Sequence, residues 1–150
     1  MEQERPAEPA FRPKTFGPGI HVLYADGACD GNPGPASFAA VLFDDGGREV
    51  ERASGPIGKA TNNIAEYVAL QRGLECALAR GVRRIHVLMD SELVVRQMSG
   101  QYRVKHPNLK KLYAAVEPLR KRFAHFAISY VPRHLNGLAD RLAAAALKGK

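Results

Sequence analysis

The chain has 150 residues, of which 45% are hydrophobic and 25% charged, and its formal net charge is +7. These values are typical of one globular domain and exclude a fully disordered chain, a collagen-like repeat and a disulfide scaffold. Cys29 and Cys76 form no closely spaced pair, no apolar run reaches the ~20 residues that span a bilayer, and the N-terminus lacks a hydrophobic leader. We therefore expect a reduced, cytoplasmic protein with no membrane partner.

The first 19 residues are rich in proline. Pro6, Pro9, Pro13 and Pro18 each fix φ and lack a backbone donor. The sequence therefore predicts an extended, poorly ordered tail at 1–19, followed by a folded domain at 20–148.

Three strands are predicted in the first third of the domain. Apolar or β-rich runs occur at 20–26, 37–43 and 48–54, and clusters of turn residues separate them at 27–35 and 44–47. The second cluster, Asp-Asp-Gly-Gly, is a hairpin signal. We therefore expect three antiparallel strands in a meander.

Helical periodicity replaces this pattern in the rest of the chain. The expected elements are helices at 62–80, 91–98, 108–123 and 136–147, the last capped by Asn136, and strands at 84–89 and 126–131. A strand–helix–strand unit places its strands parallel through a right-handed crossover. The chain as a whole therefore predicts an α/β domain in which one mixed sheet carries helices on its faces.

Charge is unevenly divided along the chain. Residues 21–92 hold ten acids and seven bases, whereas residues 93–150 hold two acids and twelve bases. A strongly basic half favours a polyanionic partner such as a nucleic acid, although a solvated basic surface has the same composition.

Four carboxylates stand where the predicted sheet would bring them together. Asp26 and Asp90 end two strands that we expect to be parallel neighbours, while Glu66 and Asp140 lie in the first turns of two helices. Sites in open α/β sheets form at the carboxyl ends of strands, so the four side chains should converge. Their repulsion would raise their pKa values or demand cations, and an all-oxygen set suits Mg²⁺ or Mn²⁺, two of which can bracket a phosphate.

Each acid also has a purely structural explanation. Asp26 could open a turn, and Glu66 could close a capping box with Asn63. Asp90 could cap the following helix, and Asp140 could be a first-turn acid that the helix dipole favours. Spacing alone is compatible with both sets of roles.

Four segments resemble the motifs of type 1 ribonuclease H and follow the family's order across residues 20–147. They are YADGACDGNPGP at 24–35, TNNIAE at 61–66, LMDSELV at 88–94 and VPRHLNGLADRLA at 131–143. The resemblance implies a ribonuclease H-like α/β fold, with a five-stranded mixed sheet of order 3-2-1-4-5 flanked by helices. It also implies hydrolysis of the RNA strand of RNA/DNA hybrids to 5′-phosphate and 3′-hydroxyl ends by two Mg²⁺ or Mn²⁺ ions, with no organic cofactor.

The resemblance assigns roles to residues of this chain. Asp26, Glu66, Asp90 and Asp140 match the family's catalytic metal ligands, and His134 matches a histidine that aids proton transfer or product release. The implied substrate-binding residues are Gly27, Ala28 and Cys29 near the RNA backbone, Asn32, Asn62 and Asn63 at the minor-groove edge, and Lys59 and Thr61 in a phosphate pocket for the DNA strand. No feature of the sequence demands more than a monomer.

One segment common in bacterial members is absent. The chain holds no tryptophan and lacks the basic helix and loop that follow the third acidic motif in those members. Binding of the DNA strand should then rely on other bases, such as Arg103, Lys105, Lys110 and Lys111, with steep salt dependence.

Two other functions stay open. A non-catalytic nucleic-acid-binding module could use the same fold, and so could another nuclease such as a junction resolvase. The four acids argue against the first, and the NPGP and TNNxxE segments argue against the second.

Overall fold

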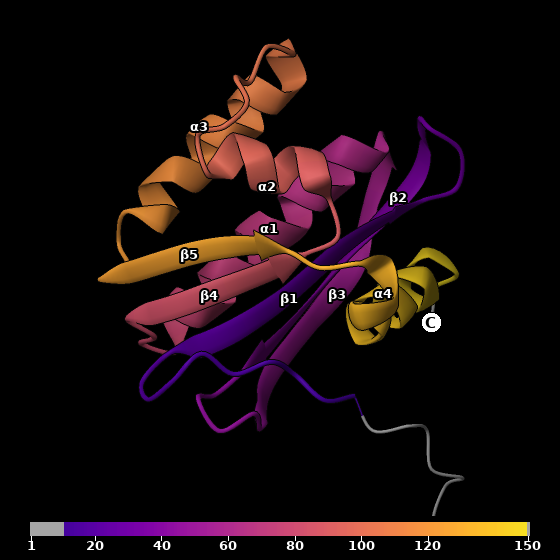
Figure 1. Ribbon diagram of the computed structural model, residues 1–150. Helices are drawn as coiled ribbons and strands as arrows, with labels where there is room; N and C mark the ends of the chain where they lie inside the picture. The colour runs from indigo at the N-terminus through magenta and orange to yellow at the C-terminus, as the bar shows by residue number, and fades with distance from the viewer. Residues whose placement is uncertain (1–10, 150) are drawn as a thin grey trace, which may run out of the picture.

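Five strands form one mixed sheet in the computed structural model, which describes residues 11–149. They are β1 (His21–Cys29), β2 (Gly34–Phe43), β3 (Glu49–Ala60), β4 (Arg84–Met89) and β5 (His125–Tyr130). Their order is β3-β2-β1-β4-β5, with β1, β2 and β3 antiparallel and β1, β4 and β5 parallel (Figure 1). The predicted α/β class and strand order are confirmed.

The first strand continues beyond its predicted end. Asp26 lies within β1, which pairs with β2 as far as Cys29. Its parallel pairing with β4, however, stops at Ala25 opposite Met89. The carboxylate of Asp26 therefore stands at the carboxyl end of the parallel pair, as the prediction requires, although the strand itself goes on.

β3 is also longer than the predicted strand at 48–54. It runs through Pro56 to Ala60 and pairs with β2 along its length, with a register shift between Ala36 and Ser37. Proline lacks a ladder donor, but β3 lies at an edge of the sheet, where one side of the strand needs no partner. The irregular register accommodates the residue.

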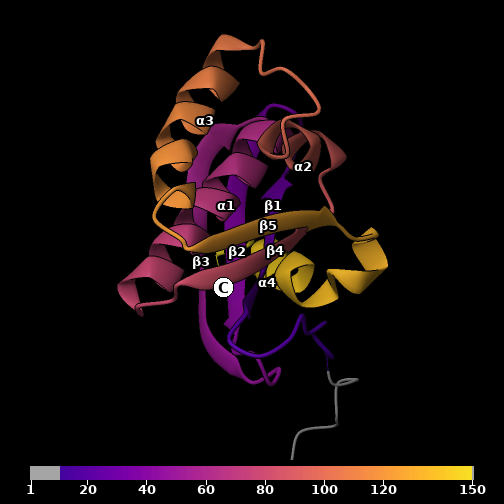
Figure 2. The ribbon, with the colours of Figure 1, turned by 60° about the vertical axis from the view of Figure 1, so that its left-hand side comes forward.

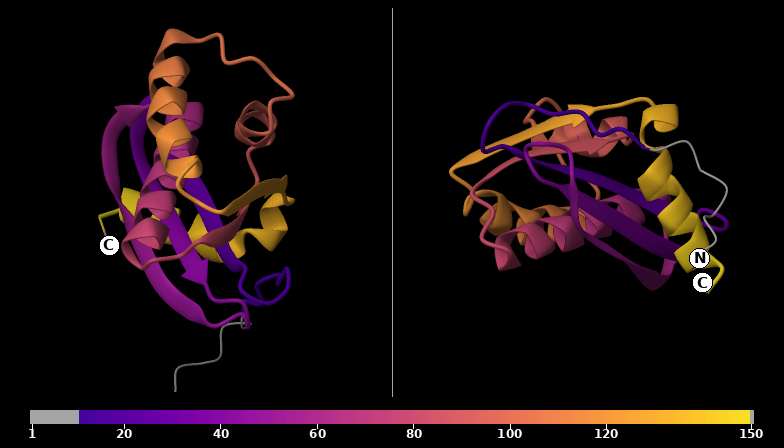
Figure 3. Two further views of the ribbon diagram at one scale, coloured as in Figure 1. Left: turned by 90° about the vertical axis from the view of Figure 1, so that its left-hand side faces the viewer. Right: turned by 90° about the horizontal axis from the view of Figure 1, so that it is seen from below.

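Four α-helices and one short 3₁₀ turn complete the described part of the chain. They are α1 (Asn62–Ala79), α2 (Glu92–Met98), α3 (Pro107–Arg120), η1 (Arg133–Leu135) and α4 (Gly137–Leu147). The predicted helices are confirmed, whereas η1 is an addition. α1, α2 and α3 lie on one face of the sheet, and α4 lies on the other (Figure 2; Figure 3, right). Among these helices none combines the length and the apolarity that a bilayer crossing needs.

The main core lies between α1 and the sheet. Tyr67, Leu70 and Leu74 are fully buried there against alternate residues of β1, β2 and β4. A Cβ on Gly73 would lie 2.7 Å from the side chain of Leu23. A glycine in a helix interior costs about 1 kcal/mol, and here it allows α1 to approach the sheet closely.

The opposite face is covered by α4 together with residues 11–19. Phe11 packs edge-on against Tyr24 with ring centroids 4.8 Å apart, and Phe16 stacks on His86 at 3.6 Å. The backbone N–H of Lys14 donates to the Tyr24 hydroxyl at 2.9 Å. For this part of the tail the predicted poor order is wrong, because its aromatic residues cover apolar strand residues. Residues 1–10 lie outside the described residues.

Substituting Phe11 tests this packing. We expect Phe11→Ala to lower the free energy of unfolding by about 2 kcal/mol, less than for a fully buried phenylalanine, because the side chain is half-buried. Arg12→Ala, at an exposed neighbour, should change it by less than about 0.5 kcal/mol. Urea denaturation measures both, and equal stability of the two variants would contradict the packing role.

Candidate active site

Three carboxylates meet at one end of the parallel strands. Asp26 of β1, Glu66 of α1 and Asp90 after β4 each offer an oxygen, and these atoms lie within 4.8 Å of one another. Asp26 is 5% exposed and Glu66 8%. The donor set is carboxylate oxygen alone, which fits a hard divalent cation such as Mg²⁺ or Mn²⁺.

Asp140 stands apart from this group. It lines the same cavity of about 590 Å³ as the three carboxylates, together with Arg133 and the end of α4. Its Oδ1 pairs with the Arg133 guanidinium at 3.2 Å. The structure therefore places the fourth predicted acid in the lining of the same cavity, with its charge compensated by an arginine.

The close approach of α1 to β1 at Gly27 places Glu66 beside Asp26. The backbone N–H of Gly27 donates to Glu66 Oε1. A Cβ on Gly27 would lie 2.6 Å from the Glu66 backbone nitrogen, so only glycine lets α1 pass this close to β1. The helix is capped by Thr61, whose Oγ1 accepts from Ile64 N–H at 3.2 Å. The capping-box explanation for Glu66 and Asn63 is therefore wrong.

Asp90 is not a helix cap either. The N-cap of α2 is Ser91, whose Oγ accepts from Val94 N–H at 3.3 Å. The carboxylate of Asp90 is thus left to the cavity. Its position follows from β4, whose last residue, Met89, pairs with Ala25 of β1.

Asn136 ties α4 to the strand that carries Asp26. The sequence predicts a side-chain cap at this residue, but its amide Nδ2 instead donates across to the Ala25 carbonyl at 3.1 Å. The Asn136 carbonyl accepts from Asp140 N–H at 3.0 Å. Asn136 is fully buried, so this bond fixes the first turn of α4 relative to β1.

Burial and like charge hold protons in the cluster. Burial, followed by the negative charge of Glu66, raises the pKa of Asp26 far above its ordinary value. Burial also raises the pKa of Glu66, although hydrogen bonds from Asp26 and from Gly27 N–H oppose the shift. Two such carboxyl groups share a proton when no cation is bound. A divalent ion would take the place of that proton.

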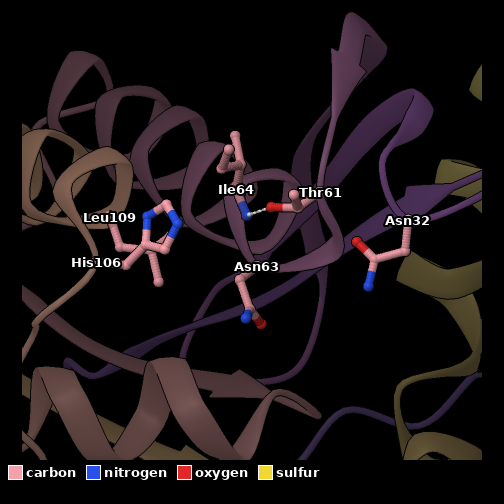
Figure 4. A pocket seen from close by; sticks show the side chains of 6 residues that line it. All are labelled: Asn32, Thr61, Asn63, Ile64, His106 and Leu109. Atoms are coloured by element: carbon pink, nitrogen blue, oxygen red, sulfur yellow. Dashed lines mark hydrogen bonds between the residues drawn. The ribbon is translucent and has the colours of Figure 1, made fainter.

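A second, polar hollow of about 250 Å³ lies beside the acidic cavity. Its lining residues are Asn32, Thr61, Asn63, Ile64, His106 and Leu109, which Figure 4 shows on the turn after β1, at the start of α1 and at the start of α3. Asn63 lines both cavities. Neutral donors around a concave space suit an anionic group such as a phosphate.

His106 is the residue of this hollow that the sequence prediction missed. Its Nδ1 accepts from Asn108 N–H at 3.2 Å, so it caps α3. A histidine directly before a proline at a helix start was a signal for the cap, but nothing local indicated that α3 would face Asn32. Lys59, by contrast, is exposed on β3 and does not line the hollow.

The remaining predicted residues divide into two groups. Gly27, Ala28, Cys29 and Asn62 line the acidic cavity. The Cys29 thiol donates to the Ala60 carbonyl at 3.0 Å, as expected of a packing group. His134, in the exposed turn η1, lines neither cavity. Its neighbour Arg133 does line the acidic cavity.

Known proteins are similar to this chain in fold and in sequence. The family described as "Reverse transcriptase-like" matches residues 24–146. The bifunctional protein Rv2228c of Mycobacterium tuberculosis is 47% identical over 123 residues, which are 81% of this chain and 34% of that protein. Ribonuclease HI of Halobacterium salinarum is 41% identical over 128 residues, 85% of this chain and 64% of that protein.

A solved structure extends the comparison. LC11 ribonuclease H1 in complex with an RNA/DNA hybrid has a TM-score of 0.82 and 39% identity, and the match covers 86% of this chain and 97% of that one. The chain spans about a third of the length of the mycobacterial relative and about two thirds of the archaeal one.

The raised pKa values predict how the stability of the metal-free protein depends on pH. Asp26 and Glu66 bind more protons folded than unfolded above pH ~4, so their contribution to stability is lost as the pH rises. We expect Asp26→Asn in EDTA to gain at least about 1 kcal/mol over the parent chain between pH 5 and pH 8. Urea denaturation at both pH values measures this gain, and a constant difference would contradict the shared proton.

The Asn136 bond can be tested in the same way. Asn136→Ala leaves the Ala25 carbonyl without this partner, so we expect a loss of about 2 kcal/mol in the free energy of unfolding. It should also weaken Mn²⁺ binding, because α4 carries Asp140. Asn108→Ala, at an exposed helical position, is the matched control. Parent-like Mn²⁺ affinity in Asn136→Ala would show that this bond does not position the site.

Proposed function

The chain belongs to the type 1 ribonuclease H family, and we propose on that premise that it is a metal-dependent endonuclease hydrolysing the RNA strand of RNA/DNA hybrids to 5′-phosphate and 3′-hydroxyl ends. The observation that carries this proposal is the meeting of Asp26, Glu66 and Asp90 in a cavity bordered by a polar hollow. The solved LC11 relative in complex with a hybrid supports the choice of substrate.

The four carboxylates would hold two ions between them. Asp26, Glu66 and Asp90 would hold one Mg²⁺ or Mn²⁺, and Asp140 would contribute to a second after leaving Arg133. Such ions, when bound, supply an activated water and stabilise the leaving oxygen. In their absence the Asp26–Glu66 pair keeps a proton, and Arg133 compensates Asp140.

The two strands of the hybrid would bind in different places. The RNA backbone would lie along Gly27, Ala28 and Cys29, where Asn62 and Asn63 can reach the 2′-hydroxyl that distinguishes RNA from DNA. A phosphate of the DNA strand would occupy the hollow beside Thr61, with Asn32 and His106 opposite and Lys59 nearby; these contacts complete the proposed substrate site.

The rest of the proposal concerns His134 and the protein's setting. From its exposed turn, His134 would transfer a proton at the rim of the cavity or assist the departing product, rather than act on the buried carboxylates. We propose a monomeric, cytoplasmic enzyme that needs no organic cofactor.

Cleavage of labelled duplexes tests the function. An RNA/DNA hybrid, duplex DNA and duplex RNA are each incubated with Mg²⁺, Mn²⁺ or EDTA and resolved on a gel. We expect cleavage of the hybrid's RNA strand alone, and only with a divalent ion. Asp26→Asn should lose at least about 10³-fold of the rate, since the ion generates the nucleophile. Glu75→Gln, which neutralises an exposed acid of α1, should match the parent.

Other results would select the other functions. Binding of the hybrid without cleavage, under any metal condition, would favour the non-catalytic module. Cleavage of branched or duplex DNA in preference to the hybrid would favour another nuclease of the superfamily.

A further inference from the structure

Residues 11–19, which we call the strap, lie outside the region that the family model matches, since that region begins at residue 24. None of the strap residues belongs to a helix or a strand. They cross the face of the sheet that α4 also covers (Figure 1). The strap is therefore held by side-chain contacts and single hydrogen bonds, and it can leave the sheet without breaking any strand pairing.

Both ends of the strap are attached. Phe11 packs edge-on against Tyr24 with ring centroids 4.8 Å apart, and the Lys14 N–H donates to the Tyr24 hydroxyl at 2.9 Å. At the other end, the Gly19 N–H donates to Oδ2 of Asp45 at 2.8 Å. These contacts place the middle of the strap over β4.

Phe16 and His86 form the central contact. Their rings are nearly parallel, at 14°, with centroids 3.6 Å apart. His86 is half-buried in β4, between its register partners Val22 of β1 and Ala127 of β5. Its Nε2 also lies 2.8 Å from Ser129 Oγ. A hydroxyl both donates and accepts, so this bond exists with either protonation state of the imidazole and does not oppose a change between them.

The groups that face His86 are basic or neutral. Lys14 of the strap and His125 of β5 lie near enough for their positive charges to act on it. Arg84, two residues earlier in β4 and so on the same face, reaches the end of the strap. From β1 the face presents Tyr24, whose pKa is raised by burial, so that the phenol stays neutral. Among the ion pairs of the described residues, none gives His86 a carboxylate partner.

A proton on His86 therefore acts against the closed strap. Burial, followed by the charges of His125 and Lys14, lowers the pKa of His86 from its ordinary value of 6.5. A cation–π attraction to Phe16 acts in the other direction, but the imidazolium would give up hydration and meet three bases of like sign. The neutral form favours closure, so the contribution of this contact is complete above the ordinary pKa. It is lost as the pH falls through the lowered one.

We propose that the strap opens when His86 is protonated, and that it is a pH-operated cover over Tyr24 and the apolar residues beside it. Leu138 and Leu142 of α4 pack on the same apolar cluster as the strap. Opening would therefore remove one side of the packing around α4 while the strand ladder stays intact. The inference does not depend on the proposed function, because it concerns the face of the sheet away from α1.

Amide hydrogen exchange of the full chain, followed by NMR in EDTA, tests the strap directly. The closed strap protects the Lys14 N–H, which donates to the Tyr24 hydroxyl. We expect its protection factor, corrected for intrinsic exchange, to fall at least about threefold from about pH 7.5 to about pH 5. Protonation of Asp26 and Glu66 over this range stabilises the fold, so it cannot imitate the loss.

Two variants separate titration from packing. His86→Phe keeps a ring for Phe16 but cannot take a proton, so protection of the Lys14 N–H should be the same at both pH values. Phe16→Ala keeps the imidazole but removes its stacking partner, so protection should be low at both. The pKa of His86 in that variant should return towards its ordinary value, because the ring is no longer covered. His86→Gln repeats the first test with a smaller side chain.

His21→Gln is the matched control. His21 directly precedes Val22, the register partner of His86, and therefore lies on the other face of β1. This variant should keep the parent's dependence on pH. Thermal melting checks that every variant is folded.

Two results would overturn the inference. One is protection of the Lys14 N–H in the parent that is equal or greater at about pH 5 than at about pH 7.5. The other is a parent-like loss of protection in both His86→Phe and His86→Gln, since neither variant carries the group that is proposed to titrate.

Discussion

Mutual repulsion among carboxylates is the constraint that the rest of this structure must satisfy. Asp26, Glu66 and Asp90 are brought within 4.8 Å although like charges at that distance oppose each other strongly, above all when two are buried. The scaffold overcomes the repulsion by steric and hydrogen-bond constraints on the backbone. Gly27 lets α1 pass β1 at close range, and its N–H binds Glu66. The stability of the core, and not the site itself, holds the charges together.

The fourth acid is held in a different way. Asn136 and Ser37 anchor α4 to the sheet, the first through the Ala25 carbonyl and the second by donating to the Ala143 carbonyl at 2.5 Å. The helix is therefore fixed, and Asp140 turns to Arg133. The pairing of Asp140 with Arg133 therefore leaves three closely spaced acids, rather than four, without a basic partner.

Sequence patterns predicted most of the fold because they are local. Alternation and helical spacing predicted the five strands and the four α-helices. The expected parallel pairing of β1 with β4 then predicted that Asp26 and Asp90 would be neighbours. What the sequence missed depends on contacts between distant segments. Nothing near Phe11 indicates that it packs on Tyr24, and nothing near His106 indicates that it faces Asn32. The continuation of β3 through Pro56 was missed because proline is tolerated in a strand only at the edge of a sheet, and that position depends on the whole sheet.

The uneven division of charge between residues 21–92 and residues 93–150 has an electrostatic consequence for binding. A cavity lined by carboxylates repels a polyanion until a cation neutralises it, so attraction for the duplex must come from elsewhere. Under the proposed function, the basic residues of 93–150 would supply that attraction, and their exposed cations on the α2–α3 loop lie outside the acidic cavity. Under the proposed function, a bound metal ion would offset the negative charge of the carboxylates that an incoming RNA phosphate meets.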